Sequence, residues 1–358
     1  MTRPAVARIN LSALQHNLTR VQQSAPGSRV MAVIKANAYG HGLVPVARAL
    51  AAADAFGVVC LEAAISLREA GFSQRIVLLE GLFDEGDLAL IQGYQLDVVI
   101  HHISQLELLE QGRLAAPVDV WLKIDTGMNR LGFSPDQAAA VTERLQRLPQ
   151  LGSLRYLTHF ACADERDNPA TQVQLDRFGE SCADLNGERS LANSAAVLAW
   201  PASHADWVRP GIMLYGASPL CGETAQDLGL QAVMTLATRL IAVNPHNKGD
   251  AVGYGADWIC PEDMPVGVAA MGYGDGYPRH APIGTPLLVN GKRAALIGRV
   301  SMDMVCVDLR TQPDAKVGDE VVLWGEGLPV DEVAQQAGTI AYELLCGVGS
   351  RVQFEYFS

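Results

Sequence analysis

The 358-residue sequence lacks the marks of several protein classes. Its seven cysteines are scattered, at positions 60, 162, 182, 221, 260, 306 and 346, with no CxxC spacing. This pattern predicts reduced thiols in a cytoplasmic protein and no zinc site. Acidic residues outnumber basic ones by 39 to 27 without any basic run, which disfavours binding to nucleic acid or to an anionic membrane. No apolar stretch approaches about 18 residues, and the N-terminus lacks the apolar segment of a signal peptide.

What is present is the composition of a large globular core. Hydrophobic residues make up 49% and charged residues 18% of the chain, and its length predicts about two domains. Helix-like segments alternate with short apolar runs near 30–35, 55–59, 75–79, 96–101, 118–124, 154–160, 189–193 and 211–214. Because strand and helix alternate regularly, we expect the α/β class and an N-terminal (β/α)8 TIM-type barrel.

The pattern changes near residue 230. From Val233 onward the runs are short and alternating, and Asn290-Gly291 is a strong two-residue hairpin signal. We therefore predict a barrel domain over 1–230 and a C-terminal, mostly β domain over 231–358, with one late helix around 331–337. The first strand, about 5–10, is a candidate to pack with the C-terminal domain.

Lys35 ends the first buried apolar run of the barrel, in the sequence VIKANAYGHG. A lysine there has its stem in the core and its amine at the rim. An amine made neutral by burial is a nucleophile that forms a Schiff base with a carbonyl. The alternative is a lysine that only extends its amine to solvent, and this stretch alone does not separate the two.

Polar residues follow or end several other predicted strands. They are Lys123, Asp125 and Arg130 around 118–130, His159 in 154–160, Ser194 after 189–193, and Arg209 before 211–214. Each alone has a structural explanation, such as a hydrogen-bonded core histidine or a salt bridge. Because strand ends of a barrel meet at one face, together they predict a ligand site.

Glycine and aromatic residues cluster in the C-terminal half, at 252–256, 272–279 and 299–303. These clusters lack the GxGxxG spacing of a dinucleotide site and the GK[ST] of a phosphate-binding P-loop. Tight β turns are their alternative explanation.

The motifs VIKANAYGHG, KIDTGMNRLG, THFACADE, VRPGIMLYG, VGYGADW, MGYGDGYPR and GRVSMDM stand in this order in the chain. In this the sequence resembles the alanine racemases, which use pyridoxal 5′-phosphate (PLP), over nearly its whole length. The resemblance implies a barrel, a C-terminal β domain and a head-to-tail homodimer in which each site takes residues from both subunits. The activity it implies is interconversion of L- and D-alanine, for peptidoglycan or for alanine catabolism.

The resemblance also assigns the reacting groups. Lys35 would hold PLP and act as the base for D-alanine, while Tyr254 of the partner subunit would be the base for L-alanine. A free tyrosine loses its proton only near pH ~10, so His159, backed by Arg209, would assist Tyr254. Arg209 would also face the pyridine nitrogen of PLP.

The remaining assignments concern the cofactor phosphate and the substrate. Phosphate would be held by Tyr39, Ser194 and the backbone N–H groups of Gly211 and Ile212. Ser350 stands where many relatives have a phosphate-binding tyrosine, so that contact is in doubt. The substrate carboxylate would meet Arg130 and the partner's Met302. Supporting residues would be Lys123, Asp303, Tyr273 and Arg279, with Lys123 either carbamylated or an ordinary lysine paired with Asp125.

Two other functions compete with an alanine racemase. A broader amino-acid racemase is disfavoured because such enzymes are commonly exported. A non-catalytic PLP-binding carrier shares the barrel and the lysine but lacks a second domain, so Tyr254 and Met302 disfavour it.

Overall fold

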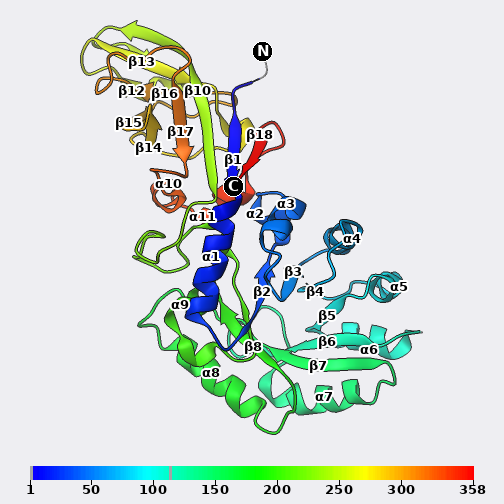
Figure 1. Ribbon diagram of the computed structural model, residues 1–358. Helices are drawn as coiled ribbons and strands as arrows, with labels where there is room; N and C mark the ends of the chain where they lie inside the picture. The colour runs from blue at the N-terminus through cyan, green and yellow to red at the C-terminus, as the bar shows by residue number, and fades with distance from the viewer. Residues whose placement is uncertain (1–2, 113–114) are drawn as a thin grey trace.

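The computed structural model describes residues 3–112 and 115–358. Figure 1 shows the chain as two parts stacked along a long axis, a barrel at one end and a strand-rich domain at the other. Helix α1 (Leu11–Ser24) starts at the junction between them and runs down beside the barrel. It follows directly on β1 (Val6–Asn10), and the Asn10 side chain caps it by accepting from the Ala13 N–H at 3.1 Å.

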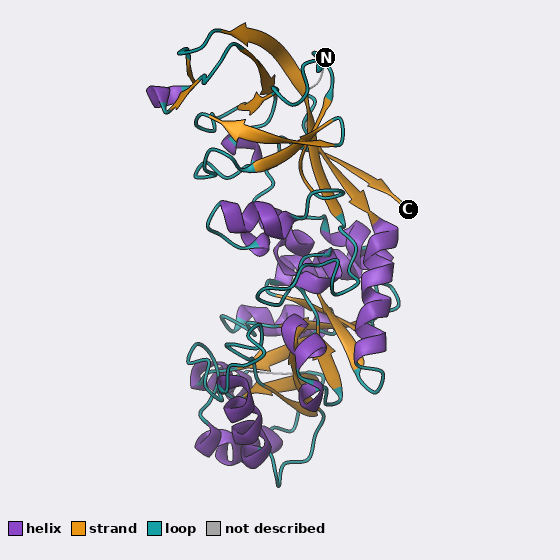
Figure 2. Cartoon of the chain, turned by 90° about the vertical axis from the view of Figure 1, so that its left-hand side faces the viewer, coloured by secondary structure: helices purple, strands orange, loops and turns teal. Residues whose placement is uncertain are grey.

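Within the described residues, eight parallel strands close into a barrel, which confirms the predicted fold class. The strands are β2 (Arg29–Val33), β3 (Ala55–Val58), β4 (Arg75–Leu78), β5 (Asp97–Ile100), β6 (Val118–Lys123), β7 (Leu151–Leu157), β8 (Arg189–Asn193) and β9 (Trp207–Arg209). Helices that connect them cover the outside: α3 (Leu43–Ala49), α4 (Leu61–Glu69), α5 (Gly86–Gly93), α6 (Ile103–Gln111), α7 (Ala138–Gln146), α8 (Ala170–Ser181) and α9 (Ser194–Ala199). Figure 2 shows this ring of helices around the strands.

The barrel interior is filled rather than open. One buried cluster takes a side chain from nearly every strand: Met31, Ala55, Val77, Val99, Trp121, Leu157 and Trp207. Because side chains alternate along a strand, these residues point inward and close the barrel. The functional side chains are thereby confined to the strand ends and loops.

The C-terminal domain is built on an antiparallel sheet. Its strands are β10 (Met234–His246), β13 (Met264–Ala269), β14 (Pro286–Val289), β15 (Lys292–Ile297), β16 (Val305–Asp308) and β17 (Glu320–Trp324), and β10 pairs with both β13 and β17. The Asn290-Gly291 turn joins β14 to β15 with φ of 49° and 74°, as the hairpin signal predicts. Strand β1 pairs with β10 and with β18 (Gln353–Phe357), so the N-terminal strand belongs to this sheet.

Several predicted elements need correction. Strand β7 spans Leu151–Leu157 instead of 154–160, so His159 follows the strand. The last barrel strand is β9 (Trp207–Arg209), whereas the apolar residues predicted as that strand form a 3-10 helix at Ile212–Tyr215. The first barrel strand ends at Val33, two residues earlier than predicted. A helix α11 (Ala341–Cys346) follows α10 (Val330–Gln336), where one late helix was expected. Short apolar runs do not distinguish a strand from a buried turn, which is why these boundaries were misplaced.

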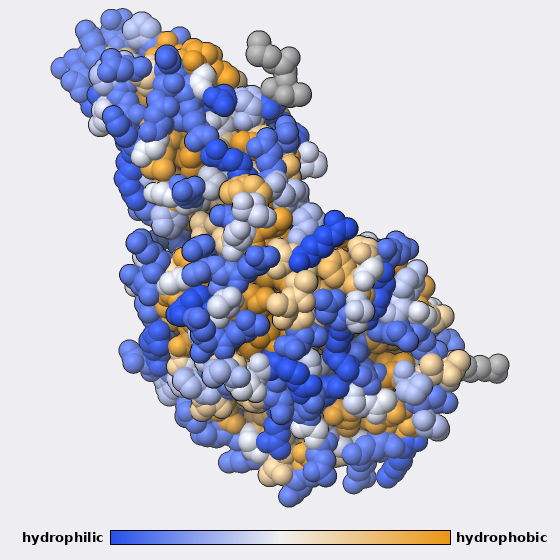
Figure 3. Space-filling view, viewed as in Figure 1, coloured by the Kyte–Doolittle hydropathy of each residue, from blue (hydrophilic) through white to orange (hydrophobic). Residues whose placement is uncertain are grey.

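The surface in Figure 3 is mostly hydrophilic, with hydrophobic patches over both domains. Among the described residues, no helix has the length and hydropathy needed to cross a bilayer.

Candidate functional site

A cavity of about 540 Å³ opens at the end of the barrel where the strands finish. It is lined by Lys35, Tyr39, Lys123, Arg130, His159, Ser194, Arg209, Gly211 and Ile212, together with residues of α11. The barrel residues among them come from segments up to 177 positions apart, from position 35 to position 212. The barrel therefore brings together all the barrel residues for which the sequence predicts a direct role.

Lys35 begins a short turn, α2 (Lys35–Tyr39), of unusual hand. Residues Ala36 to Tyr39 all have φ between 51° and 54°, which is left-handed helical backbone at four consecutive non-glycine residues. Such backbone costs about 1–2 kcal/mol per residue, so the surrounding structure must hold it. The turn places Lys35 and Tyr39 at the same cavity.

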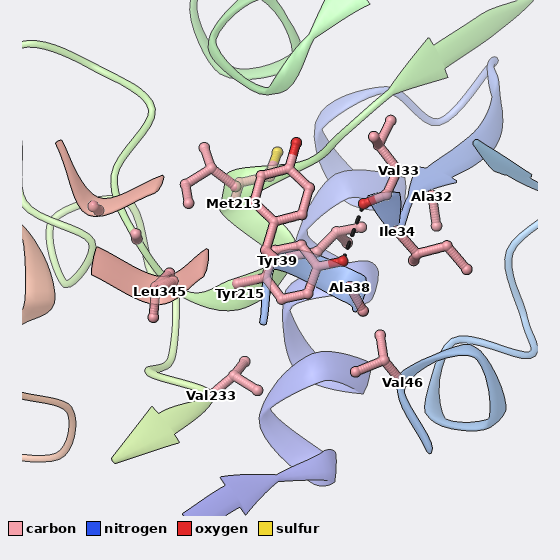
Figure 4. Close-up of a cluster of buried hydrophobic side chains, with 14 of the residues drawn as sticks. Ala32, Val33, Ile34, Ala38, Tyr39, Val46, Met213, Tyr215, Val233 and Leu345 are labelled. Carbon is pink, nitrogen blue, oxygen red and sulfur yellow. Dashed lines mark hydrogen bonds between the residues drawn. The ribbon is translucent and has the colours of Figure 1, made fainter. Parts of the chain in front are cut away.

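Several buried groups hold this turn. The His41 ring nitrogen Nδ1 lies 2.8 Å from the Tyr39 carbonyl oxygen and 3.2 Å from that of Ala38. Burial lowers the pKa of His41 to about 4, so the ring is neutral and donates its Nδ1–H to these carbonyls. Figure 4 shows the rings of Tyr39 and Tyr215 packed together, 4.6 Å between centroids, with the Tyr215 hydroxyl bonded to the Val33 carbonyl.

Helix α11 closes the turn from the other side. Gly40 has a φ of 80°, and a Cβ there would collide with the carbonyl oxygen of Leu345. Glycine is required at this close approach of two backbones. Through α11 the C-terminal domain forms part of the wall around Lys35.

The groups assigned to phosphate form a cradle. The Ser194 Oγ accepts the Gly211 N–H at 2.7 Å, and Gly211 leaves room for the Tyr39 hydroxyl, which would lie 2.5 Å from a Cβ at that position. Among the described residues, the Ile212 N–H has no protein acceptor. A tyrosine hydroxyl, a serine hydroxyl and the Ile212 N–H, around a space without a Cβ, fit a phosphate oxyanion.

Arg209 and His159 are a connected pair. The Arg209 guanidinium is buried and donates to the Ser190 Oγ at 2.7 Å and to the Thr158 carbonyl at 2.6 Å, while its Nη2 lies 3.3 Å from His159 Nδ1. Burial lowers the pKa of Arg209 only to about 10, so it stays charged. Burial and the Arg209 charge, followed by Lys123, Arg130 and Lys35, hold the pKa of His159 well below its usual value. His159 is therefore neutral, and because guanidinium only donates, its proton lies on Nε2.

Lys123 is a buried lysine without a partner. Its residue is 8% exposed, and within the described residues no hydrogen bond or ion pair reaches its amine. Burial, then Arg209 and Arg130, lower its pKa to about 8. The Asp125 carboxylate instead accepts the N–H groups of residues 127–130 at 3.0–3.1 Å, which folds the loop that carries Arg130. The Lys123–Asp125 pair, which was the alternative to carbamylation, is absent from the part of the chain that the structure describes.

The predicted residues of the C-terminal domain lie outside this cavity. Tyr254 is 68% exposed and Met302 52% exposed, and Tyr273, Arg279, Asp303 and Ser350 do not line it either. Figure 1 shows strand β12 (Trp258–Ile259), just beyond Tyr254, at the end of the molecule opposite the barrel. These residues therefore do not meet the barrel residues within one subunit.

Among the lining residues that the sequence did not predict are two from the C-terminal domain, Tyr342 and Cys346. The Tyr342 ring lies 5.9 Å from that of Tyr39, and burial raises the pKa of its hydroxyl to about 12. Tyr342 and Cys346 are four residues apart, which puts both side chains on one face of a helix. That spacing does not indicate which part of the protein the face packs against.

Two family models match the chain. The model described as alanine racemase, N-terminal domain, matches residues 9–219, and the model described as alanine racemase, C-terminal domain, matches residues 233–356. The chain belongs to the alanine racemase family. It is therefore an enzyme, an isomerase.

Known relatives agree in sequence and in structure. The alanine racemase of Thioalkalivibrio sulfidiphilus is 57% identical over 359 residues, covering 99% of each chain, and that of Shewanella sediminis is 53% identical over 347 residues, covering 97% of each. The crystal structure of the biosynthetic alanine racemase from Pseudomonas aeruginosa matches with a TM-score of 0.98 and 50% identity over the whole of both chains.

Proposed function

We propose that this alanine racemase works with PLP in the barrel cavity and with two bases, one from each subunit of a head-to-tail homodimer in the cytoplasm. The observation that carries the proposal is the convergence of Lys35, the Ser194–Gly211 cradle and the Arg209–His159 pair on one cavity. D-Alanine made here would serve peptidoglycan synthesis, or the same reaction would serve alanine catabolism.

The residues present fit the cofactor. When bound, PLP withdraws electrons from the α-carbon of an attached amino acid and so makes its α-proton removable. Lys35 would hold the cofactor covalently, and Tyr39, Ser194 and the N–H groups of Gly211 and Ile212 would hold its phosphate. Arg209, which has donors only, would face the ring nitrogen and leave it unprotonated.

Inversion needs proton transfer on both faces of the α-carbon. Lys35 would move the proton on one face, with D-alanine as its substrate. Tyr254 would act on the other face with L-alanine. Since Tyr254 is 68% exposed and does not line the cavity of its own subunit, we infer that it acts in the partner's site. Tyr273 and Arg279 would narrow the entrance, so that only a small side chain is admitted.

His159 would make Tyr254 a better base. A neutral ring with its proton on Nε2 can donate a hydrogen bond to the phenolic oxygen and stabilise its ionised form. Arg209, 3.3 Å behind the ring, keeps His159 in that tautomer.

The substrate carboxylate would lie between Arg130 and the partner's Met302. Arg130 can donate two parallel hydrogen bonds to the carboxylate. Met302 would donate its backbone N–H, with Asp303 in support. Lys123 beside Arg130 is unpaired and has a pKa lowered to about 8, so part of it is a neutral amine near neutral pH. We infer that this amine takes up CO₂, releasing one proton, and becomes a carbamate anion that pairs with Arg130.

Incubation of the enzyme with ¹³C-bicarbonate is expected to give a carbamate carbon resonance that is lost in Lys123→Ala. Since only the neutral amine reacts, the signal should grow as the pH rises through about 8. A resonance of equal size in Lys123→Ala would assign it elsewhere, and no resonance in the parent enzyme at pH 9 would leave Lys123 an ordinary lysine.

The proposed reaction is tested with L-alanine in deuterated water containing the purified PLP-loaded enzyme. We expect D-alanine to form, carrying deuterium at the α-carbon, because the proton is removed and replaced from solvent-exchanging groups. D-Alanine without α-deuterium would contradict two exchanging bases, and deuteration without inversion would contradict bases on opposite faces.

A further inference from the structure

Met302 lies on a turn that is fastened to a second turn of the C-terminal domain. The Ser301 carbonyl accepts the Tyr273 N–H at 3.0 Å, and the Met302 carbonyl accepts the Gly274 N–H at 2.9 Å. At Gly272 a Cβ would collide with both carbonyl oxygens, so the contact requires glycine. The Ser301 carbonyl and the Met302 N–H belong to one planar peptide unit, so the bond from Tyr273 fixes the direction of the Met302 N–H. That N–H has no acceptor among the described residues.

The carboxylate of Asp275 lies beneath both turns and is fully buried, at 0% exposure. It accepts the Gly272 N–H at 2.9 Å, the Arg3 Nη2 at 2.6 Å and the Arg351 Nε at 3.2 Å. A buried carboxylate is stable only with such charged and backbone donors around it.

The two arginines connect Asp275 to the residue that follows Met302. Arg3 Nη2 also donates to the Asp303 carbonyl oxygen at 2.5 Å, and Arg351 Nη2 donates to the Asp303 side chain at 2.6 Å. Arg3 precedes β1 and Arg351 precedes β18, so three distant segments meet at this carboxylate. The Met302 turn is thus held on one side by backbone bonds and on the other by two guanidinium groups.

We propose that Asp275 is a positioning residue that aims the Met302 N–H at the substrate carboxylate in the partner's site. The proposal rests on the shared site proposed above. Asp275 touches neither substrate nor cofactor; it acts by fixing the turn through Arg3, Arg351 and the Gly272 N–H.

The competing explanation is that Asp275 acts within its own subunit. Its carbonyl accepts the Gly349 N–H at 2.9 Å, just after α11, which lines the cavity beside Lys35. A defect in the cofactor cavity of the same subunit would then follow its loss.

Asp275→Asn is expected to raise KM for alanine about tenfold with little change in kcat. Tenfold is about the effect of losing one hydrogen bond to a charged group. Because this bond is made equally in the ground state and the transition state, its loss changes KM and leaves kcat nearly unchanged. The visible absorption of bound PLP should not change. Arg3→Met leaves Asp275 paired with Arg351, so it should also raise KM, by a smaller factor. This variant replaces Asp275→Asn in the test if Asp275→Asn does not fold. The control is Arg293→Met, which removes only the exposed pair with Glu332.

Mixed dimers locate the effect. Asp275→Asn subunits are mixed with inactive Lys35→Ala subunits. In a mixed dimer only one site is competent: its barrel, with Lys35, comes from the Asp275→Asn subunit, and its C-terminal domain, with Asp275 intact, comes from the Lys35→Ala subunit. We expect the parent KM in these dimers. A raised KM in these dimers would overturn the proposal and favour the route through α11. Unchanged KM values in both folded variants would overturn the proposal as well. A Lys35→Ala plus Tyr254→Phe mixture that gains no activity would instead refute the shared site itself.

Discussion

Lys35→Ala is expected to abolish racemisation, with a loss of about 10⁴-fold or more in kcat/KM. The variant would remove both the proposed covalent hold on PLP and one of the two proposed bases, and a single acid–base group alone contributes about 10²–10⁴-fold. Activity is measured as D-alanine formation from L-alanine and as the reverse reaction. The absorption band of lysine-bound PLP should disappear at the same time.

The matched control is Lys292→Ala, at the exposed start of strand β15. It should keep both the activity and the absorption band. The unusual turn after Lys35 is held by His41, Tyr215 and Gly40 rather than by the lysine amine, so Lys35→Ala should unfold at the same temperature as the parent. Retained racemisation in a PLP-loaded Lys35→Ala enzyme would remove Lys35 from the mechanism.

Tyr254→Phe is expected to lose most of its α-proton exchange from L-alanine, by about 10²–10⁴-fold, while retaining more exchange from D-alanine. The phenyl ring preserves size and removes only the hydroxyl that would carry the proton on one face. Exchange is followed by α-deuteration of each enantiomer in separate experiments. Because Tyr254 is 68% exposed in its own subunit, the substitution should leave stability nearly unchanged.

Tyr94→Phe, in the barrel and away from the cavity, is the control for loss of a tyrosine hydroxyl. Equal losses with both enantiomers in Tyr254→Phe would contradict the assignment of one base to each face. Mixing Tyr254→Phe with Lys35→Ala should restore part of the activity, since one of the two sites then has both bases.

Much of this protein could be predicted from its sequence because the signals are local. Alternating strand and helix segments with buried strands predict the barrel, since each unit covers its neighbour in turn. The position of Lys35 at the end of an apolar run, and of Lys123 and Ser194 after others, predicts that they meet at one face. The Asn290-Gly291 hairpin is likewise a local matter of left-handed backbone.

Other features depend on contacts between distant segments. The left-handed turn at 36–39 contains no glycine, and it exists because His41, Tyr215 and α11 hold it. The last barrel strand is 207–209 because only this segment pairs with both β8 and β2, although the following apolar residues look equally suitable.

The charged groups of the site also divide into features that local sequence predicts and features that distant contacts decide. The sequence places Lys123 two residues before Asp125, but the tertiary structure uses the carboxylate to fold the Arg130 loop and leaves the amine alone. The hydrogen bonds around Asp275 join residues 3, 275, 303 and 351, which no local pattern connects. The sequence by itself determined the family, the barrel and the lysine that stands at its rim. The fold decided which buried charges are neutralised and which are left to meet a ligand, because pairing depends on distances that only the folded chain defines.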